Sequence, residues 1–224
     1  MPDAATPVTI AIADGATVSG LLHSPAAARA CYVLAHGAGA GMKHPFLATA
    51  AAGLAERCIA TLRYQFPYME RGSKRPDSPK VAQAAVRAAV EEAARRLPGV
   101  PLFAGGKSFG GRMTSQAQAE APLPGVRGLA LLGFPLHAPG QPSGERAAHL
   151  ARVTVPMLFL QGSRDDFAKL DFLQPVIAGL GQRATLKLFE DADHSFHVPA
   201  RSGRNDHEVM GQVLDQIAQW IGGL

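Results

Sequence analysis

Apolar residues along this chain gather in short continuous runs, which are separated by Ala-rich, amphipathic or glycine-rich stretches. A short run that is apolar at every position is typical of a strand buried on both faces of a sheet. We predict such a strand at 30–35 and further strands at the mostly apolar runs 58–63, 100–104, 126–132, 156–161 and 184–189.

The stretches between these runs have the composition of helices or loops. Helices are predicted at 46–57, 81–97, 112–120, 167–180 and 205–221. The helix at 81–97 has a clear stop signal, because Pro98-Gly99 follows it. We expect an irregular segment at 64–79, a glycine-rich turn at 105–111, and at 133–155 a loop with room for one short helix.

The N-terminal region carries the signal of a hairpin. Two apolar-rich runs, 8–13 and 17–23, flank Asp14-Gly15, a dipeptide favoured in tight turns. Strands and helices alternate after this hairpin. That order predicts an α/β fold with a mostly parallel sheet of about eight strands, helices on both faces and no large lid. The sequence shows no repeat and no linker, so we expect residues 1–224 to form a single domain.

Composition narrows the class of protein further. Hydrophobic residues make up 47% of the 224 residues and charged residues 18%, which favours a globular chain with a sizeable core. The net charge of +4 comes without a basic stripe interleaved with aromatic residues, so we expect no nucleic-acid partner. The N-terminus does not resemble a signal peptide and no apolar run reaches the ~18 residues of a membrane span, so we expect no membrane association and a cytoplasmic location.

Cysteine usage indicates neither a disulfide framework nor a metal site. Cys31 and Cys58 both fall in apolar runs that we interpret as strands, and neither has metal-ligand spacing. We expect two buried, reduced thiols. No metal and no cofactor is expected.

Polar clusters follow four of the predicted strands. His36-Gly37 comes after 30–35, Ser108 after 100–104, Asp165 after 156–161 and His194 after 184–189. Reactive groups of parallel sheets gather at the carboxyl ends of the strands. We therefore expect these four clusters to meet at one edge of the sheet.

The segment Gly106-Lys107-Ser108-Phe109-Gly110 matches the G-x-S-x-G pattern of a nucleophile elbow. The match alone is weak evidence, but an apolar strand precedes it and a helix-forming stretch follows it. The alternative is a phosphate-binding loop, because Lys107-Ser108 resembles the end of that motif. That motif requires glycine at position 101, where this chain has Pro101. We therefore predict that Ser108 is a nucleophile.

A serine hydroxyl needs a base, and the base needs an orienting carboxylate. His194 occupies the expected place after the last strand, whereas His197, three residues on, is expected to point elsewhere. Asp165 is preferred as the third member, because the adjacent Asp166 is better placed to cap the helix predicted from 167. The predicted order is Ser108, Asp165, His194.

Acyl transfer also needs N–H groups that stabilise the oxyanion. One donor is expected from the backbone of Phe109, directly after the nucleophile. The second is expected from the loop after His36-Gly37, at Ala38 or at Gly39. His36 itself is interpreted as a structural hydrogen-bonding residue. Aromatic residues after the strand at 58–63 either line an acyl pocket or belong to the core, namely Tyr64, Phe66 and Tyr68.

These motifs together resemble the α/β-hydrolase superfamily over nearly the whole chain. The matching pieces are 36–39, 106–110, 161–165 and 193–196. In size and in the lack of a lid the chain looks like the dienelactone-hydrolase-like group of small bacterial hydrolases, although dienelactone hydrolase has a cysteine nucleophile where this chain has Ser108. The stretches 62–68 and 75–77 resemble a subgroup of uncharacterised hydrolases that is similar to the hydrolase-like domain of a chromatin-complex subunit.

The resemblance implies an α/β-hydrolase fold and a serine hydrolase that cleaves ester-type bonds of small or short-chain acyl substrates. A small ester-like molecule is then the expected partner, and the sequence does not indicate an oligomeric state. A thioesterase, amidase or peptidase with the same three residues is an alternative. So is a non-catalytic interaction module, whose mark would be a missing member of the three, and none is missing.

Overall fold

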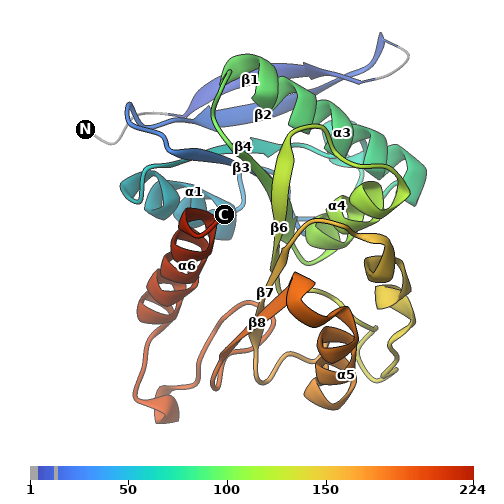
Figure 1. The fold of residues 1–224 in the computed structure, drawn as a ribbon, viewed down its shortest axis with the longest axis vertical. Helices are drawn as coiled ribbons and strands as arrows, with labels where there is room; N and C mark the ends of the chain where they lie inside the picture. Colours follow the sequence, from blue (N-terminus) through green and yellow to red (C-terminus); the bar gives the residue numbers. More distant parts are fainter. Residues whose placement is uncertain (1–4, 13–14) are drawn as a thin grey trace.

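The computed structural model describes residues 5–12 and 15–224, which build one eight-stranded sheet. The strands lie in the order β1-β2-β4-β3-β5-β6-β7-β8 (Figure 1). Only the pairings of β2 with β1 and β4 are antiparallel; the other five are parallel. The bounds are β1 Thr6–Ala11, β2 Thr17–His23, β3 Ala30–Ala35, β4 Ile59–Tyr64, β5 Leu102–Lys107, β6 Val126–Leu132, β7 Met157–Gly162 and β8 Ala184–Phe189. The predicted mostly parallel sheet is confirmed.

Helices cover both faces of the sheet, as expected. Figure 1 shows α1 and α6 on one face and α3, α4 and α5 on the other. Their bounds are α1 Pro45–Glu56, α3 Pro79–Arg96, α4 Phe109–Glu120, α5 Leu170–Leu180 and α6 Asp206–Gly222. The connection from β6 to β7, described throughout, contains a short 3₁₀ helix at Glu145–Arg152 and no lid. Within the described residues, none of the helices has both the length and the apolar character needed to cross a bilayer.

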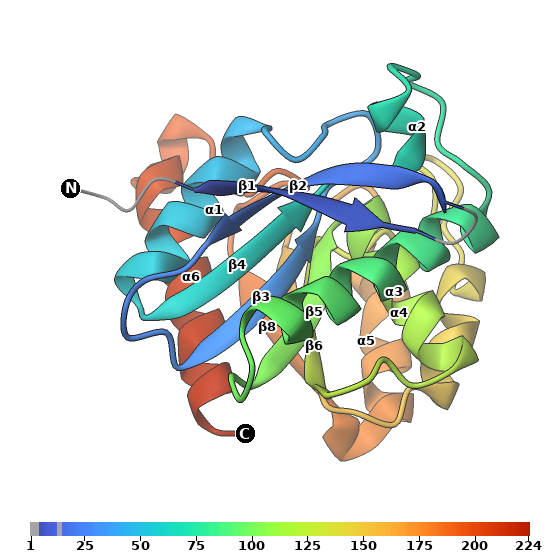
Figure 2. The same cartoon turned by 90° about the horizontal axis from the view of Figure 1, so that it is seen from above.

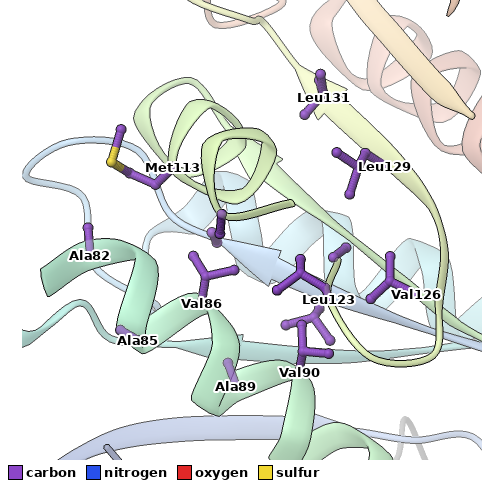
Figure 3. Packing of buried hydrophobic residues seen from close by; sticks show 14 of the residues in the cluster. Ala82, Ala85, Val86, Ala89, Val90, Met113, Leu123, Val126, Leu129 and Leu131 are labelled. Carbon is purple, nitrogen blue, oxygen red and sulfur yellow. The ribbon is translucent and has the colours of Figure 1, made fainter. Parts of the chain in front are cut away.

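The helices on the two faces of the sheet bury residues of different size. On the α3 face, small residues repeat at helical spacing, so that the helix approaches the sheet closely (Figure 3). These buried residues include Ala82, Ala85, Val86, Ala89 and Val90, which belong to one cluster with Leu129 and Leu131 of β6. On the other face α6 buries larger residues, such as Leu214, Ile217 and Ile221, and Phe103 packs against Trp220 with ring centroids 5.7 Å apart.

The N-terminal hairpin is present, with Ala11 of β1 paired to Thr17 of β2. Ala13 and Asp14 of the predicted turn lie outside the described residues. The predicted irregular segment after β4 contains a short helix, α2, at Pro67–Glu70. Cys58, predicted within a strand, instead occupies the turn before β4 with φ 58°. This prediction was wrong because the apolar run starts one residue before the strand does.

Two predicted boundaries around the G-x-S-x-G segment were wrong. The strand continues through Gly105 and Gly106 to Lys107, and the helix begins at Phe109 although Gly110 and Gly111 follow. Glycine is unfavourable in both strands and helices, so propensity alone places a loop here. Tertiary packing overrides that preference.

The helix predicted from 167 also begins later, at Leu170. Its first position is preceded by Lys169, whose side chain makes no capping hydrogen bond. Asp166 is therefore not the cap that the sequence indicated. Instead its carboxylate pairs with Lys169 Nζ at 2.9 Å on the surface.

The order of the strands places a crevice at the centre of the sheet. From β3 the chain moves to β4 on one side and then returns to β5 on the other side (Figure 2). The loops that leave the carboxyl ends of β3 and β5 therefore diverge, and ligands bind at such points in open α/β sheets. The loop at His36 and the turn at Ser108 lie at this point.

Candidate active site

A single residue, Ser108, connects β5 to α4, with φ 50° and ψ −116°. This left-handed conformation is strained for a residue with a side chain. It is imposed by close packing against the end of β3. A Cβ at Gly106 would lie 2.3 Å from the carbonyl oxygen of Ala35, and one at Gly110 would lie 2.6 Å from that of His36. Glycine is therefore required at both ends of the turn, which gives the G-x-S-x-G spacing its physical cause.

The structure brings Ser108, His194 and Asp165 together. Ser108 Oγ lies 2.9 Å from His194 Nε2, and Asp165 Oδ2 lies 2.7 Å from His194 Nδ1. Because the carboxylate accepts, Nδ1 carries the proton, and Nε2 is left to accept from the serine hydroxyl. The ring of Phe167 packs against the imidazole with centroids 4.4 Å apart, which holds its orientation.

The side chain of Asp165 has no exposed surface, and three hydrogen-bond donors take the place of water around its carboxylate. Besides His194, the side-chain amide of Gln161 donates to Oδ2, and the Phe167 backbone N–H donates to Oδ1 at 2.8 Å. The Gln161 amide is itself oriented, because its oxygen accepts from the Phe134 N–H at 2.9 Å. Sequence reasoning missed Gln161; its signal was a polar residue at the buried end of an apolar strand.

The two rival residues lie outside this group. The Asp166 side chain is 73% exposed and pairs with Lys169. The His197 side chain is 62% exposed and pairs with Asp206 at 2.8 Å, and this partner raises the pKa of His197. Neither hydrogen bonds to Ser108 or to His194 in the described structure.

Hydrogen bonds among its own polar groups hold the conformation of the loop that carries His194. Asp193 Oδ1 accepts from the N–H groups of Ser195 at 2.7 Å and His197 at 2.9 Å. The Arg164 N–H donates to the Ala192 carbonyl at 2.9 Å, which ties this loop to the loop of Asp165. His194 and Asp165 are therefore held in fixed positions relative to each other.

His36 is fully buried and bonded through both ring nitrogens. Nε2 accepts from the Phe66 N–H at 3.1 Å, so Nδ1 carries the proton and donates to the Gly37 carbonyl at 2.7 Å. Burial lowers the pKa of His36 to about 4, which keeps the ring neutral near pH 7. The structural role expected of His36 agrees with this geometry.

Several backbone N–H groups near Ser108 have no hydrogen-bond partner among the described residues, and those of Ala38 and Phe109 are among them. Phe109 is the first residue of α4, where N–H groups lack a partner within the helix. The Gly39 N–H, by contrast, donates to the hydroxyl of Tyr68 at 2.9 Å. The free donors are therefore at Ala38 and Phe109 rather than at Gly39.

The aromatic residues at the end of β4 and directly after it belong to the core. Tyr64, Phe66 and Tyr68 are each at most 1% exposed. Phe66 packs edge-on against Phe109 with centroids 5.3 Å apart. They pack against the loop at 36–39 and the start of α4. None of them lines either of the two cavities near Ser108, which are described next.

These two cavities adjoin each other next to the turn at Ser108. A small one of about 90 Å³ is lined by Gly37, Ala40, His44, Phe46, Leu47, Lys107 and Ser195. A wider depression of about 450 Å³ shares Ala40 and His44 with it. Lys107 and Ser195 on its wall are the chain neighbours of Ser108 and His194, so the small cavity lies close to these two residues.

Within residues 5–12 and 15–224, no three His, Cys, Asp or Glu side chains are placed to hold a metal ion. Both cysteines are free, Cys31 buried and Cys58 half-buried. Burial raises the pKa of the Cys31 thiol to about 12, so this thiol is unreactive.

Solved structures share this architecture. A lidless α/β serine hydrolase from Xanthomonas campestris superposes with a TM-score of 0.76 at 20% identity, covering 98% of this chain and 96% of that one. A dienelactone hydrolase from Anabaena variabilis gives 0.78 at 18% identity, covering 98% and 97%. Est1E from Butyrivibrio proteoclasticus, solved with ferulic acid bound, gives 0.72 at 17% identity, covering 94% and 99%.

These solved structures are too distant in sequence to assign a family to the chain, but a family model assigns one. The model described as an alpha/beta hydrolase domain matches residues 28–222. That range runs from the start of β3 to the end of α6 and includes all the clusters brought together at the carboxyl edge of the sheet. The chain therefore belongs to the α/β hydrolase family.

Proposed function

We propose that this protein is a serine hydrolase that cleaves ester bonds of small or short-chain acyl substrates. The observation that carries the proposal is the unbroken hydrogen-bond chain from Ser108 Oγ through His194 to Asp165. This chain ends on a strained turn beside two unpaired N–H groups. A nucleophile, a base, an orienting carboxylate and oxyanion donors within reach of one point are the requirements of acyl transfer.

In the first half of the reaction, Ser108 Oγ attacks the ester carbonyl while His194 Nε2 takes the hydroxyl proton. The negative charge that develops on the carbonyl oxygen is stabilised by the N–H groups of Phe109 and Ala38. Asp165 holds the ring tautomer and stabilises the imidazolium. His194 then donates its proton to the leaving alkoxide, the ester C–O bond breaks, and the acyl group remains on Ser108.

In the second half, a water molecule replaces the alcohol. His194 removes a proton from this water, which attacks the acyl carbon. The oxyanion forms again between the same two N–H groups. Collapse breaks the bond to Ser108 Oγ, which recovers its proton from His194, and the free acid leaves.

The preference for small acyl groups follows from the space beside Ser108. The cavity next to the nucleophile has a volume of only about 90 Å³, and no lid covers the site with additional apolar surface. A short acyl chain fits this cavity, whereas a long chain would lie in water along the wider depression. Two of the structural neighbours are described as esterases, which agrees with an ester substrate.

Labelling with a fluorophosphonate tests the proposal without knowledge of the natural substrate. We expect one covalent adduct per chain, located on Ser108 by peptide mass spectrometry. The Ser108→Ala variant should not be labelled, while the Ser195→Ala variant, which lacks the serine on the wall of the same cavity, should be labelled normally. A folded wild-type protein without an adduct would contradict the proposal.

A series of p-nitrophenyl esters of increasing acyl length tests the specificity. We expect kcat/KM to be highest for acetate to butyrate and to fall for octanoate and longer chains. A maximum at the long chains would refute the assignment of the small cavity to the acyl group.

A further inference from the structure

Lys107 directly precedes the proposed nucleophile, but its side chain takes no part in the reaction described above. Its side chain leaves the end of β5 on the side of α1, where it lines the small cavity together with Phe46. The stem runs beside the loop after β3, since a Cβ at Gly37 would lie 3.8 Å from Lys107 Cγ. A cationic side chain therefore forms part of the wall that a bound acyl group would contact.

The ammonium of Lys107 lacks a hydrogen-bond partner. Nζ is buried and makes no hydrogen bond to any described residue. Its nearest aromatic neighbours are the rings of Phe46 and Phe196, each with its centroid 5.9 Å away. Aromatic faces attract a cation weakly and do not replace the hydrogen bonds that three N–H donors require.

Lys107 remains a cation at neutral pH despite this burial. Desolvation lowers the pKa of Lys107 to about 8, against the opposing influence of Asp165 and Asp193. Asp165 accepts from His194, Gln161 and Phe167, and Asp193 Oδ1 accepts from two N–H groups of its own loop. Neither carboxylate hydrogen bonds to Nζ in the described structure. The positive charge is thus offset at a distance but not bonded.

No residue on the wall of the small cavity supplies an anion that could pair with the ammonium of Lys107. Its seven lining residues include no Asp and no Glu, and the wider depression has one lysine and one glutamate on its wall, Lys43 and Glu70. A buried charge with unmet donors is costly, and a carboxylate that forms a charge-assisted hydrogen bond to it recovers that cost. The complement of this cavity is therefore a short, otherwise apolar group with a negative end.

We propose that Lys107 recognises a carboxylate on the substrate, so that the preferred substrates are monoesters of short dicarboxylic acids. This inference rests on the proposed function and names the substrate class of the same site. The free carboxylate occupies the small cavity while the ester carbonyl lies at Ser108. The lysine stem already forms part of the wall. Nζ itself lies beside Gly133, 2.8 Å from where a Cβ would stand there, so binding requires a rotation about the last side-chain bonds that turns the ammonium towards the cavity.

Two ethyl esters that differ in one group test the inference. Ethyl hydrogen succinate carries a carboxylate where ethyl levulinate carries a neutral acetyl group of nearly the same shape. We expect wild-type kcat/KM to favour the succinate ester by about 10- to 100-fold, the range of a hydrogen bond to a charged group. The Lys107→Met variant should reduce this ratio to near one. Lys169→Met, which removes an exposed lysine paired with Asp166, should keep the wild-type ratio.

Each outcome has a separate meaning. A wild-type ratio near one, in protein that labels on Ser108, overturns the carboxylate inference and leaves the serine hydrolase standing. An equal loss on both esters in Lys107→Met overturns it as well, because the lysine then supports the His194 loop rather than the substrate. If Lys107→Met does not fold, the wild-type ratio and competitive inhibition by free succinate decide, and absence of both contradicts the inference. Failure to label Ser108 instead removes the proposed function.

Discussion

The two halves of the candidate site are held in place by different means. The half that carries Ser108 and Ala38 is fixed by backbone crowding, because Gly106 and Gly110 lie directly against the end of β3. The half that carries Asp165 and His194 is fixed by side-chain hydrogen bonds from groups such as Gln161. The first half depends on which residues lack a side chain, and the second on which side chains are present.

Because of this difference, we expect substitutions in the two halves to affect folding free energy and activity differently. A new methyl group in the crowded half must displace backbone, so we expect a loss of both folding free energy and activity. A change of one polar atom in the hydrogen-bonded half leaves the packing nearly intact, so we expect activity to fall with much less loss of stability. Variants that reverse these expectations would show that the contrast is wrong.

The largest effect is expected in the hydrogen-bonded half, for Asp165→Asn. The neutral amide no longer favours the required tautomer of His194 and no longer stabilises its imidazolium. We expect kcat to fall by about 10⁴-fold, which is about 5.5 kcal/mol. Steady-state hydrolysis of a short p-nitrophenyl ester measures this loss.

The neighbouring carboxylate supplies the control for that variant. Asp166→Asn makes the same chemical change one residue away, at a side chain that faces solvent. Activity should stay within twofold of wild type. A large loss in Asp166→Asn, with little in Asp165→Asn, would exchange the roles of the two residues.

In the crowded half, Gly110→Ala is expected to cost about 3 kcal/mol of unfolding free energy. The new Cβ would lie 2.6 Å from the His36 carbonyl oxygen and 2.7 Å from the Ala35 carbonyl carbon. Both contacts are with backbone, which cannot rotate away. Urea denaturation measures the loss, and activity should fall with it because the turn at Ser108 must shift.

Gly179→Ala is the matched control, because Gly179 also lies in a helix, α5, but a Cβ there meets nothing within 4 Å. Alanine is the better helix former by up to about 1 kcal/mol, so this variant should be neutral or slightly more stable. Equal destabilisation by both substitutions would mean that crowding at the turn is not the cause.

The fold was predictable from sequence where burial alone decides the pattern. The bounds predicted for β3, β6 and β8 were correct. The pattern is clearest in β3, which is apolar and buried at every position, whereas β6 and β8 each contain one exposed charged residue, Arg127 and Lys187. The ends of β5 and α4 were not predictable from propensity. Gly105, Gly106, Gly110 and Gly111 disfavour both elements, and close contacts with backbone force the chain into them. These contacts include the end of β3 and Ala130 of β6, which are distant in sequence.

Of the candidate site, the sequence predicted the residues whose place in the chain order is informative. Ser108, Asp165 and His194 each follow a strand, and the structure places them within hydrogen-bond distance, while their catalytic roles stay predictions. Residues that act through one distant partner had no such signal. The bond from Gln161 to Asp165 and that from Gly39 to the Tyr68 hydroxyl depend on side-chain directions that no local pattern specifies.

An effect on stability alone, similar in size to that of Gly110→Ala, is expected from the titration of His36. The pKa of His36 is about 4 in the folded protein and near 6.5 when the chain is unfolded. The unfolded chain therefore binds the proton first as the pH falls. Stability is full above pH 6.5, declines as the pH falls towards 4 and is then constant, with a total contribution of about 3 kcal/mol. Urea denaturation at pH 7 and at pH 4.5 measures the decline.

His36→Gln isolates this contribution, because glutamine can still accept from the Phe66 N–H but does not titrate. His149, whose pKa burial also lowers to about 4, contributes in the same direction and remains in the variant. We therefore expect a shallower decline in His36→Gln, not its disappearance. An unchanged slope would show that His36 takes up its proton without disturbing the fold.

The smallest effect is expected for Tyr68→Phe, where the two means of support meet in one loop. The Tyr68 hydroxyl accepts the Gly39 N–H, and this bond leaves Ala38 as the free donor beside Ser108. Its removal leaves the ring packing in place but frees the Gly39 N–H, at a cost of about 1 kcal/mol. We expect kcat to fall by about fivefold with KM unchanged, since the oxyanion forms only in the transition state. If KM alone rises, the loop at 36–39 contacts the bound substrate rather than the oxyanion, and the second donor must be sought elsewhere.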